Sequence, residues 1–382
     1  MNIAIVGAGF SGAVLAHRLA TELDCRITVF DERDHVAGNC HTVRDAETGV
    51  MEHRYGPHIF HTSNERVWEF VNRFSRFRPF VNRVKAVTPR GLFPLPINLM
   101  TINQFFGKNL RPDEARAFID SIGDKSISTP VSFEDQALRF VGRDLYEAFF
   151  LGYTMKQWGV HPKDLPAAIL QRLPIRFNYD DNYYNSTYQG IPEDGYTAIV
   201  ERLLDHPHIS LHLNTRFNRE RVSEFDQVFF TGPIDAFYEH VHGRLGYRTV
   251  RFERIVADGD YQGTPVINYT DREIPYTRVA EHKHFTPWET HERTLVFREY
   301  SKATEPGDTP YYPMRRDPDK TILEKYMELA RHETRVAFLG RLATYRYLDM
   351  HAVIGEALDF ADTCVAAKVS GKPMPTLPAA FA

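Results

Sequence analysis

The spacing of apolar residues changes twice at the start of the chain and predicts a strand, a helix and a second strand. The apolar run Ile3–Val6 ends in a glycine and has the length of a buried strand. From Ala13 to Leu23 the apolar residues recur at helical spacing, and Arg26–Phe30 follows as another strand. The order predicts an α/β fold whose first unit is strand, helix, strand.

Further along the chain, helix-like and strand-like spacing of apolar residues occur in separate blocks. Helical spacing covers Asn98 to about Arg172, with Pro112 and two acids at one helix start. Strand-like segments dominate Tyr247–Phe297, which predicts an antiparallel sheet. A last strand runs through Val336 into Gly340, and a helix follows from His351 to about Ala367.

These blocks divide the chain into three predicted domains, two of them discontinuous. The fold class is α/β: a Rossmann-like nucleotide-binding domain with an inserted helical domain and an antiparallel β-sheet domain. The predicted boundaries are 1–75, 195–240 and 333–382 for the nucleotide-binding domain; 97–172 for the helical domain, with a mobile loop to about 184; and 76–96, 185–194 and 241–332 for the sheet domain.

Composition limits the classes of function without choosing among them. Of 382 residues, 25% are charged, and the formal net charge of −4 gives no overall attraction to nucleic acid or acidic membranes. We see no signal peptide and no apolar run of the ~20 residues that a membrane span needs. Cys25, Cys40 and Cys364 are scattered and odd in number, which is typical of reduced thiols in a cytoplasmic protein and assigns none of them to a metal.

The turn between the first strand and helix carries the pattern G-x-G-x-x-G at Gly7, Gly9 and Gly12. In dinucleotide-binding folds the first glycine allows the tight turn, the second leaves room for a pyrophosphate, and the third lets the helix pack on the strand. Phe10 and Ser11 lie between them, at the helix N-terminus that favours anions. Asp31 ends the second strand about 20 residues later, where an acid binds ribose hydroxyls.

Two further segments favour FAD over NAD as the dinucleotide. Glu32 and Arg33 lead to the turn Gly38–Asn39, a loop that wraps adenosine and pyrophosphate in flavoproteins. At the other end of the chain, a strand, glycine and helix bring a second helix N-terminus beside the first motif. The cofactor residues predicted there are Gly340, Arg341, Leu348, Asp349 and Met350.

His58 and His61 are spaced like a metal pair, but a Gly-Pro turn precedes them and no third ligand is near in sequence. We expect them beside a flavin ring; the alternative is a turn with two solvated histidines. No metal site is predicted.

Aromatic residues and arginines suggest where a second ligand binds. Tyr153 and Trp158 can offer flat faces to a base, or they can pack the core of the helical domain. Arg172 and Arg176 precede a polar, tyrosine-rich stretch, and arginine with tyrosine suits a diphosphate. The alternative is a solvated loop.

Taken together, these motifs resemble the UDP-galactopyranose mutase family, of the bacterial type, over essentially the whole chain. The matching segments, in family order, are Gly7–Gly12, Gly56–Thr62, Gly152–Trp158, Arg172–Pro174 with Phe177–Tyr183, Pro275–Arg278, Pro310–Pro313, and Gly340–Arg341 with Tyr347–Met350. The resemblance implies an isomerase that interconverts UDP-galactopyranose and UDP-galactofuranose without net redox change. It implies reduced FAD, whose N5 attacks the sugar to form a covalent flavin–sugar adduct while UDP leaves.

The resemblance also implies roles for individual residues. Arg172 and Arg278 hold the diphosphate, with Tyr183, Tyr312 and Tyr347 as hydrogen-bond donors. His58, His61, Asp349 and Asn268 lie near the sugar and flavin, and Arg248 and Arg341 stabilise the flavin. The residues implied around uracil are Phe149, Phe150, Tyr153, Thr154 and Trp158.

Several points stay open at this stage. An amine-oxidase-like FAD oxidoreductase shares the fold, and a UDP-sugar-binding protein without catalysis shares the arginines. The resemblance implies a homodimer and a reductant such as NADPH. The sequence does not say whether N-acetylated UDP-galactose is a substrate, or which glycan receives the product.

Overall fold

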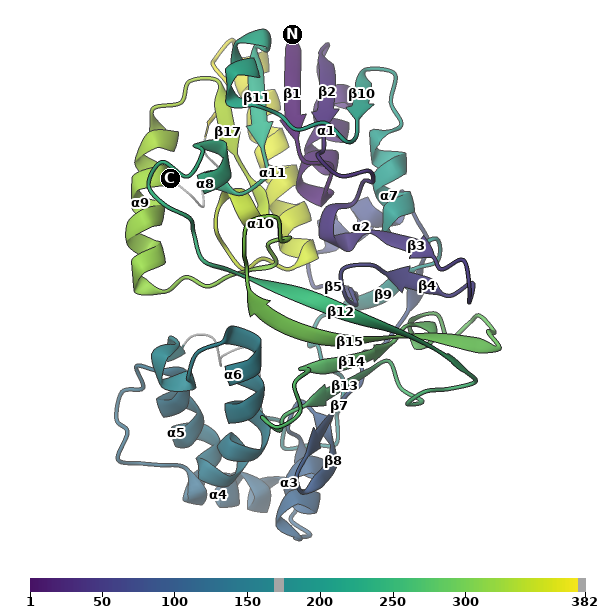
Figure 1. Ribbon diagram of the computed structural model, residues 1–382, viewed down its shortest axis with the longest axis vertical. Coiled ribbons are helices and arrows are strands. Elements are labelled where there is room, and N and C mark those ends of the chain that lie inside the picture. Colours follow the sequence, from purple (N-terminus) through teal and green to yellow (C-terminus); the bar gives the residue numbers. More distant parts are fainter. Residues whose placement is uncertain (168–174, 377–382) are drawn as a thin grey trace.

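The computed structural model describes residues 1–167 and 175–376. Three parts follow one another along the long axis: a parallel sheet with its helices, a large and mostly antiparallel sheet, and a group of helices (Figure 1). In the described residues, no helix has the length and apolar character needed to span a membrane.

The first part is a five-stranded parallel sheet, which confirms the Rossmann-like prediction. Its strands, in spatial order, are β10 (Ile209–His212), β2 (Arg26–Phe30), β1 (Asn2–Val6), β11 (Gln227–Phe230) and β17 (Val336–Phe338). Ile3 and Ile5 of β1 face one hydrophobic cluster, and Ala4 faces another, as the alternation of strand side chains requires.

Helices cover both faces of this sheet. The first cluster includes buried residues of α1 (Phe10–Glu22), α2 (Glu65–Asn72), α7 (Gly195–Leu204) and α11 (Met350–Val369). The second includes those of α8 (Ile234–Phe237), α9 (Asp317–Arg331) and α10 (Gly340–Ala343). The carboxyl ends of β1, β11 and β17 point toward the centre of the molecule, where a doubly wound sheet binds its ligand.

A seven-stranded sheet forms the middle of the molecule. Its spatial order is β16 (Tyr312–Pro313), β12 (Tyr247–Asp258), β15 (Arg293–Ala303), β14 (Arg278–Glu281), β13 (Val266–Tyr269), β7 (Val84–Thr88) and β8 (Gly91–Leu95). All neighbours pair antiparallel except β13 and β7, which are parallel.

Parts of the predicted sheet domain differ from the structure. The segment 241–332 includes α9, which packs on the parallel sheet instead. Residues 185–194 were expected in the same sheet as 241–332, yet β9 (Tyr188–Pro192) pairs instead with β5 (Phe60–Thr62) and β6 (Phe77–Pro79) in a separate three-stranded sheet. A strand's composition does not choose its partner across a long sequence separation. A further small sheet joins β3 (Thr42–Arg44) and β4 (Met51–His53).

The described helices of the helical part lie within the range 97–172 that was predicted for it. It consists of α3 (Leu99–Phe106), α4 (Pro112–Ile122), α5 (Phe133–Leu145), a π-helical turn (Tyr146–Leu151) and α6 (Gly152–Trp158). Asn98 and Ser132 cap α3 and α5 through side-chain hydrogen bonds. The end of the predicted helical stretch, from residue 168 to about Arg172, lies outside the described residues.

Candidate functional site

A cavity of about 1220 Å³ lies where the three parts meet. This volume exceeds the ~300–1,000 Å³ of an ordinary small-molecule pocket, so the cavity has room for more than one drug-sized ligand. Its walls come from the carboxyl ends of the parallel strands, from β13, β14 and β16 of the large sheet, and from α6 of the helical part.

The structure brings most of the predicted site residues to this cavity. They are Gly7, Gly9, Phe10, Ser11, Asp31, Glu32, Arg33, Gly38, Asn39, His58, His61, Phe149, Phe150, Tyr153, Thr154, Trp158, Tyr183, Asn268, Arg278, Tyr312, Arg341, Tyr347, Leu348, Asp349 and Met350. Three predicted residues lie behind the wall: Gly12, Gly340 and Arg248. Arg172 is outside the described residues.

The three glycines of the first turn have the distinct roles that their spacing predicts. Gly7 has φ +105°, and a side chain there would lie 2.0 Å from Thr231 Oγ1. A Cβ on Gly12 would lie 2.0 Å from the carbonyl oxygen of Gly7, so this glycine lets α1 pack on the turn. Gly9 differs, because a Cβ there meets only Gly38 Cα at 3.9 Å and otherwise points into the cavity. The open cradle at Gly9 fits a pyrophosphate.

Asp31 shapes this turn as well as facing the cavity. Its carboxylate accepts hydrogen bonds from the backbone N–H of Ala8 at 2.8 Å and of Arg33 at 3.0 Å. Each carboxylate oxygen accepts more than one hydrogen bond, so the group keeps capacity for ribose hydroxyls. Arg33 donates through Nη2 to Asn39 Oδ1 at 2.9 Å, while its buried Nη1 finds no partner among the described residues.

The two ends of the chain meet at the cavity, as predicted. Gly340 has φ +86°, and a Cβ on it would lie 2.4 Å from Ser11 Oγ at the start of α1. Gly340 therefore acts through this close approach and not by lining the cavity. Helix α11 begins directly after Asp349, and its first residues line the wall. The N-termini of α1 and α11 both lie at the cavity.

Arg341 presents a guanidinium whose buried Nε and Nη2 have no hydrogen-bond partner in the part of the chain that the structure describes. The group lies over the rings of Tyr312 and Tyr347, at 5.1 and 4.6 Å, and the two rings stack at 5.5 Å. Unpaired buried N–H groups are costly, so they indicate a polar ligand. Such donors fit a flavin.

Arg278 on β14 supplies the positive charge on the sheet side. Its Nη2 donates to Glu299 Oε2 at 2.7 Å, and its buried Nε has no partner among the described residues. Burial disfavours the charge, but Glu299 more than offsets this and keeps the pKa of Arg278 well above its ordinary value. Arg278 is therefore a fixed cation with a free donor.

Three tyrosines line the cavity near Arg278. Burial raises the pKa of Tyr153 and Tyr183, and it raises the pKa of Tyr312 to about 12. Their phenols stay protonated at neutral pH and can donate hydrogen bonds to an anion.

His58 and His61 both face the cavity, so the solvated turn is not what the structure shows. His58 Nδ1 lies 2.8 Å from the carbonyl oxygen of Gly56, which can only accept. Nδ1 therefore carries the proton, and Nε2 is left as an acceptor. The ring of His61 stacks on Tyr184 at 3.8 Å, and its Nδ1 lies 3.0 Å from Ser186 Oγ.

Buried histidines make the protein sensitive to acid. Burial lowers the pKa of His58 and His61 to about 4 and that of His282 to about 3, against 6.5 when unfolded. Between pH 6.5 and 4 the unfolded chain binds more protons, so the free energy of unfolding falls as the pH is lowered through this window, with the fully buried His282 contributing about 3 kcal/mol. Urea unfolding at pH 7, 6 and 5 measures this. His282→Gln should make the dependence shallower by the share of this one histidine, whereas equal stability of the unaltered protein at all three pH values would contradict the prediction.

The two alternatives for the aromatic residues of α6 both hold in part. Trp158 packs against the core of the helical part, and Tyr153 and Trp158 also line the cavity. Phe149 and Phe150 are buried in that core and reach the cavity wall.

Arg248 requires a correction. It was expected to contact the flavin, but it is buried outside the cavity. Its Nε donates to the carbonyl oxygen of Gln157 at 2.9 Å and its Nη2 to that of Lys156 at 3.2 Å. Arg248 therefore holds the C-terminal end of α6, where a cation is favourable.

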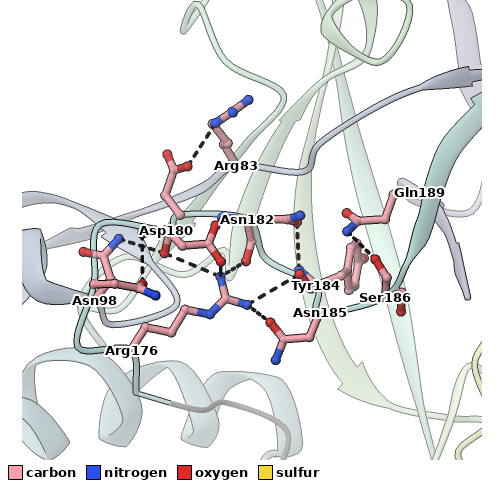
Figure 2. Close-up of polar contacts among 11 residues, drawn as sticks. Arg83, Asn98, Arg176, Asp180, Asn182, Tyr184, Asn185, Ser186 and Gln189 are labelled. Atoms are coloured by element: carbon pink, nitrogen blue, oxygen red, sulfur yellow. Dashed lines mark hydrogen bonds and ion pairs between the residues drawn. The ribbon is translucent and has the colours of Figure 1, made fainter. Parts of the chain in front are cut away.

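Arg176 also differs from the expected phosphate ligand. Figure 2 shows its guanidinium surrounded by the loop that follows it. Arg176 donates to the carbonyl oxygen of Asn182 and to Asn185 Oδ1, and it pairs with Asp180 at 3.0 Å. It is buried and does not line the cavity, so its charge is used to fold this loop.

Sequence reasoning missed several cavity residues. Tyr184 and Ser186 contact His61. A ring nitrogen of His61, a ring nitrogen of His351 and a carboxylate oxygen of Asp349 lie within 4.8 Å of one another. The signal available for Tyr184 was its position next to Tyr183. For His351 there was none beyond its place after Asp349.

Comparisons with known proteins agree with this geometry. A family model described as UDP-galactopyranose mutase matches residues 148–347, and one described as an NAD(P)-binding Rossmann-like domain matches residues 5–74. The chain is 54% identical to a probable UDP-galactopyranose mutase of Klebsiella pneumoniae, over 98% of this chain and 97% of that protein. It is 50% identical to a dTDP-fucopyranose mutase of Escherichia coli, over 94% and 97% respectively.

A crystal structure of a reduced UDP-galactopyranose mutase has the same fold. It superposes with a TM-score of 0.72 at 15% identity and covers 97% of this chain and 95% of its own.

Proposed function

Because the chain belongs to the UDP-galactopyranose mutase family, we propose that it interconverts UDP-galactopyranose and UDP-galactofuranose with reduced FAD bound in the cavity. The observation that carries this proposal is the continuity of the cavity. It joins the phosphate-binding turn at Gly9 to the aromatic face of α6, with Arg278 and the tyrosines lining it as well. A dinucleotide and a nucleotide sugar can therefore meet in one enclosed space.

The residues that fit FAD are those with open or unpaired groups. Gly9 accommodates the pyrophosphate, Asp31 and Arg33 are available to the ribose and phosphate end, and Arg341 donates to the flavin. When bound and reduced, the cofactor would supply the nucleophile that the isomerisation needs, and these residues would hold it in place.

The chain's own residues bind, orient and stabilise. Arg278 holds the diphosphate as it leaves, and Tyr183, Tyr312 and Tyr347 donate hydrogen bonds to it. These donors are placed before the reaction, so no solvent has to reorganise around the leaving charge. His58 offers its Nε2 lone pair, and Asn268 offers a buried Oδ1 that has no partner among the described residues. We assign both to the sugar and flavin end.

The comparison with the dTDP-fucopyranose mutase gives a second candidate substrate pair. The chain is 50% identical to that protein and 54% identical to the probable UDP-galactopyranose mutase, and this difference is too small to choose between the two activities. The dTDP sugar lacks the ribose 2′-hydroxyl and the sugar 6-hydroxyl and carries a 5-methyl group on the base. We favour the UDP sugar, since the family model and the slightly closer relative agree.

The experiment that tests the proposal compares substrates on the reduced holoenzyme. We expect kcat/KM for UDP-galactofuranose to exceed that for dTDP-fucofuranose, with N-acetylated UDP-galactofuranose as a third substrate. A preference for the dTDP sugar would overturn the choice of substrate. Hydrogen peroxide formation with an amine would instead support the amine-oxidase-like alternative, and UDP binding without flavin would support a non-catalytic protein.

The remaining expectations stay predictions of the sequence. They are a reductant such as NADPH, a homodimer, a cytoplasmic location and the absence of a metal.

A further inference from the structure

Lys156 lies in α6, between the two aromatic residues of that helix that line the cavity, yet it does not line the cavity itself. Its ammonium group is turned to the loop that joins β13 to β14. Nζ donates to four backbone carbonyl oxygens of this loop and its edges: Tyr269 at 2.7 Å, Asp271 at 2.7 Å, Ile274 at 3.0 Å and Tyr276 at 3.0 Å. This one side chain therefore binds both ends of the loop to α6.

An ammonium group has three N–H donors, so four acceptors at this range share all of them. Burial lowers the pKa of Lys156 to about 8, while the nearby carboxylate of Asp271 opposes that fall. At neutral pH the group is still mostly charged. Without Lys156 these carbonyl oxygens would lose their shared donor in a half-buried position, which is costly.

A second contact shows that α6 is set directly against the same loop. A Cβ on Gly152, the first residue of α6, would lie 2.2 Å from the carbonyl oxygen of Thr270. At its other end the helix is held by Arg248 and by Ser301, whose Oγ donates to the carbonyl oxygen of Gln157 at 2.7 Å. The helix is therefore fixed to the large sheet at both ends, with Lys156 between them.

The loop and the helix carry two different parts of the cavity wall. α6 contributes Tyr153 and Trp158, which we assign to the nucleobase. β13 and β14, which the loop joins, contribute Asn268 and Arg278, which we assign to the sugar and diphosphate. The contacts of Lys156 join α6 directly to the loop between these two strands.

We propose that Lys156 is a positioning residue that sets the spacing between the nucleobase subsite on α6 and the diphosphate subsite on β14. The inference rests on the proposed function, because it takes the cavity to bind a nucleoside diphosphate sugar. A ligand that spans both subsites depends on this spacing, whereas one that occupies only the nucleobase subsite does not. A misplacement of about 1 Å in such a site can lower the reaction rate by up to about 100-fold.

The test compares UDP with uridine on the FAD-bound protein, with affinity measured by isothermal titration calorimetry. Lys156→Met should weaken UDP binding by about 10- to 100-fold and raise the KM for UDP-galactofuranose similarly, with uridine affinity and flavin content unchanged. Lys156→Arg, which keeps a cation with several donors, should recover most of the loss. Lys163→Met removes an exposed lysine from the same helical part and is the matched control.

Two results would overturn the inference. One is unchanged UDP affinity in a folded Lys156→Met protein, and the other is an equal loss for UDP and uridine, which indicates general damage to α6. Should Lys156→Met fail to fold, Lys156→Gln carries the same comparison with two donors. A wild-type protein that binds UDP but does not convert UDP-galactofuranose would refute the proposed function and still leave this comparison valid.

Discussion

Replacing Arg278 with alanine should lower kcat by about 10²–10³-fold while flavin stays bound. Arg278 is the cation on β14 whose Nε points to no protein partner among the described residues, and its Nη2 is fixed by Glu299 at 2.7 Å. If it holds the departing diphosphate, its interaction strengthens as negative charge develops on UDP, so the loss should fall mainly on kcat. Steady-state kinetics with UDP-galactofuranose, together with the flavin absorbance of the purified variant, measures both effects.

Two variants separate this role from folding. Arg278→Lys keeps a positive charge beside the buried Glu299 but loses the planar fork, so the protein should stay stable while turnover still falls. Arg298→Ala removes an arginine that pairs with Glu253 and Tyr261 on the opposite face of the same sheet. It should leave turnover unchanged. Loss of flavin from Arg278→Ala would instead move this residue to the cofactor.

Gly9→Val should give a folded protein that binds flavin more weakly. Gly9 has φ −79° and ψ −176°, which other residues adopt, and a Cβ there meets no protein atom closer than 3.9 Å. A side chain that begins at this Cβ would therefore extend into the cavity, where the proposed pyrophosphate lies. Steric overlap of this kind costs about 1–3 kcal/mol, so FAD affinity should fall by about 10- to 100-fold. Flavin titration of the apoprotein checks it, with circular dichroism to confirm the fold.

Gly355→Ala is the matched control, because it adds a Cβ in α11 at ordinary contact distance from Val67, 3.4 Å away. It should keep normal flavin affinity. Full flavin occupancy in Gly9→Val would place the pyrophosphate elsewhere and contradict the account of the first turn.

The parts of the fold set by local pattern were predictable from sequence. Ile3–Val6, the helix of the first turn and the start of α4 at Pro112 each carry their signal in neighbouring residues, and the structure places them within three residues of the expected bounds. The role of Gly12 follows likewise from spacing, since it acts through a contact with the backbone of Gly7, whereas the closest contact of Gly7 is the side chain of Thr231, far away in sequence.

What the sequence could not decide was the direction of long charged side chains. Arg248 and Arg278 both lie on strands of one sheet, but Arg248 is turned to the end of α6 and Arg278 to the cavity. Arg176 donates its hydrogen bonds to the loop that follows it, and nothing in the sequence around it distinguishes it from an arginine that binds phosphate. Lys156 belongs to a motif that was recognised, yet its partners lie more than a hundred residues away.

The most direct test of the account is to incubate purified protein with UDP-galactofuranose, with and without dithionite, and to separate the products by chromatography. The account predicts conversion to UDP-galactopyranose only when the flavin is reduced, because the reduced cofactor supplies the nucleophile and the protein supplies binding and charge stabilisation. Equal conversion by the oxidised protein would contradict the role assigned to the cofactor. No conversion by reduced, flavin-containing protein would contradict the mutase activity with this substrate.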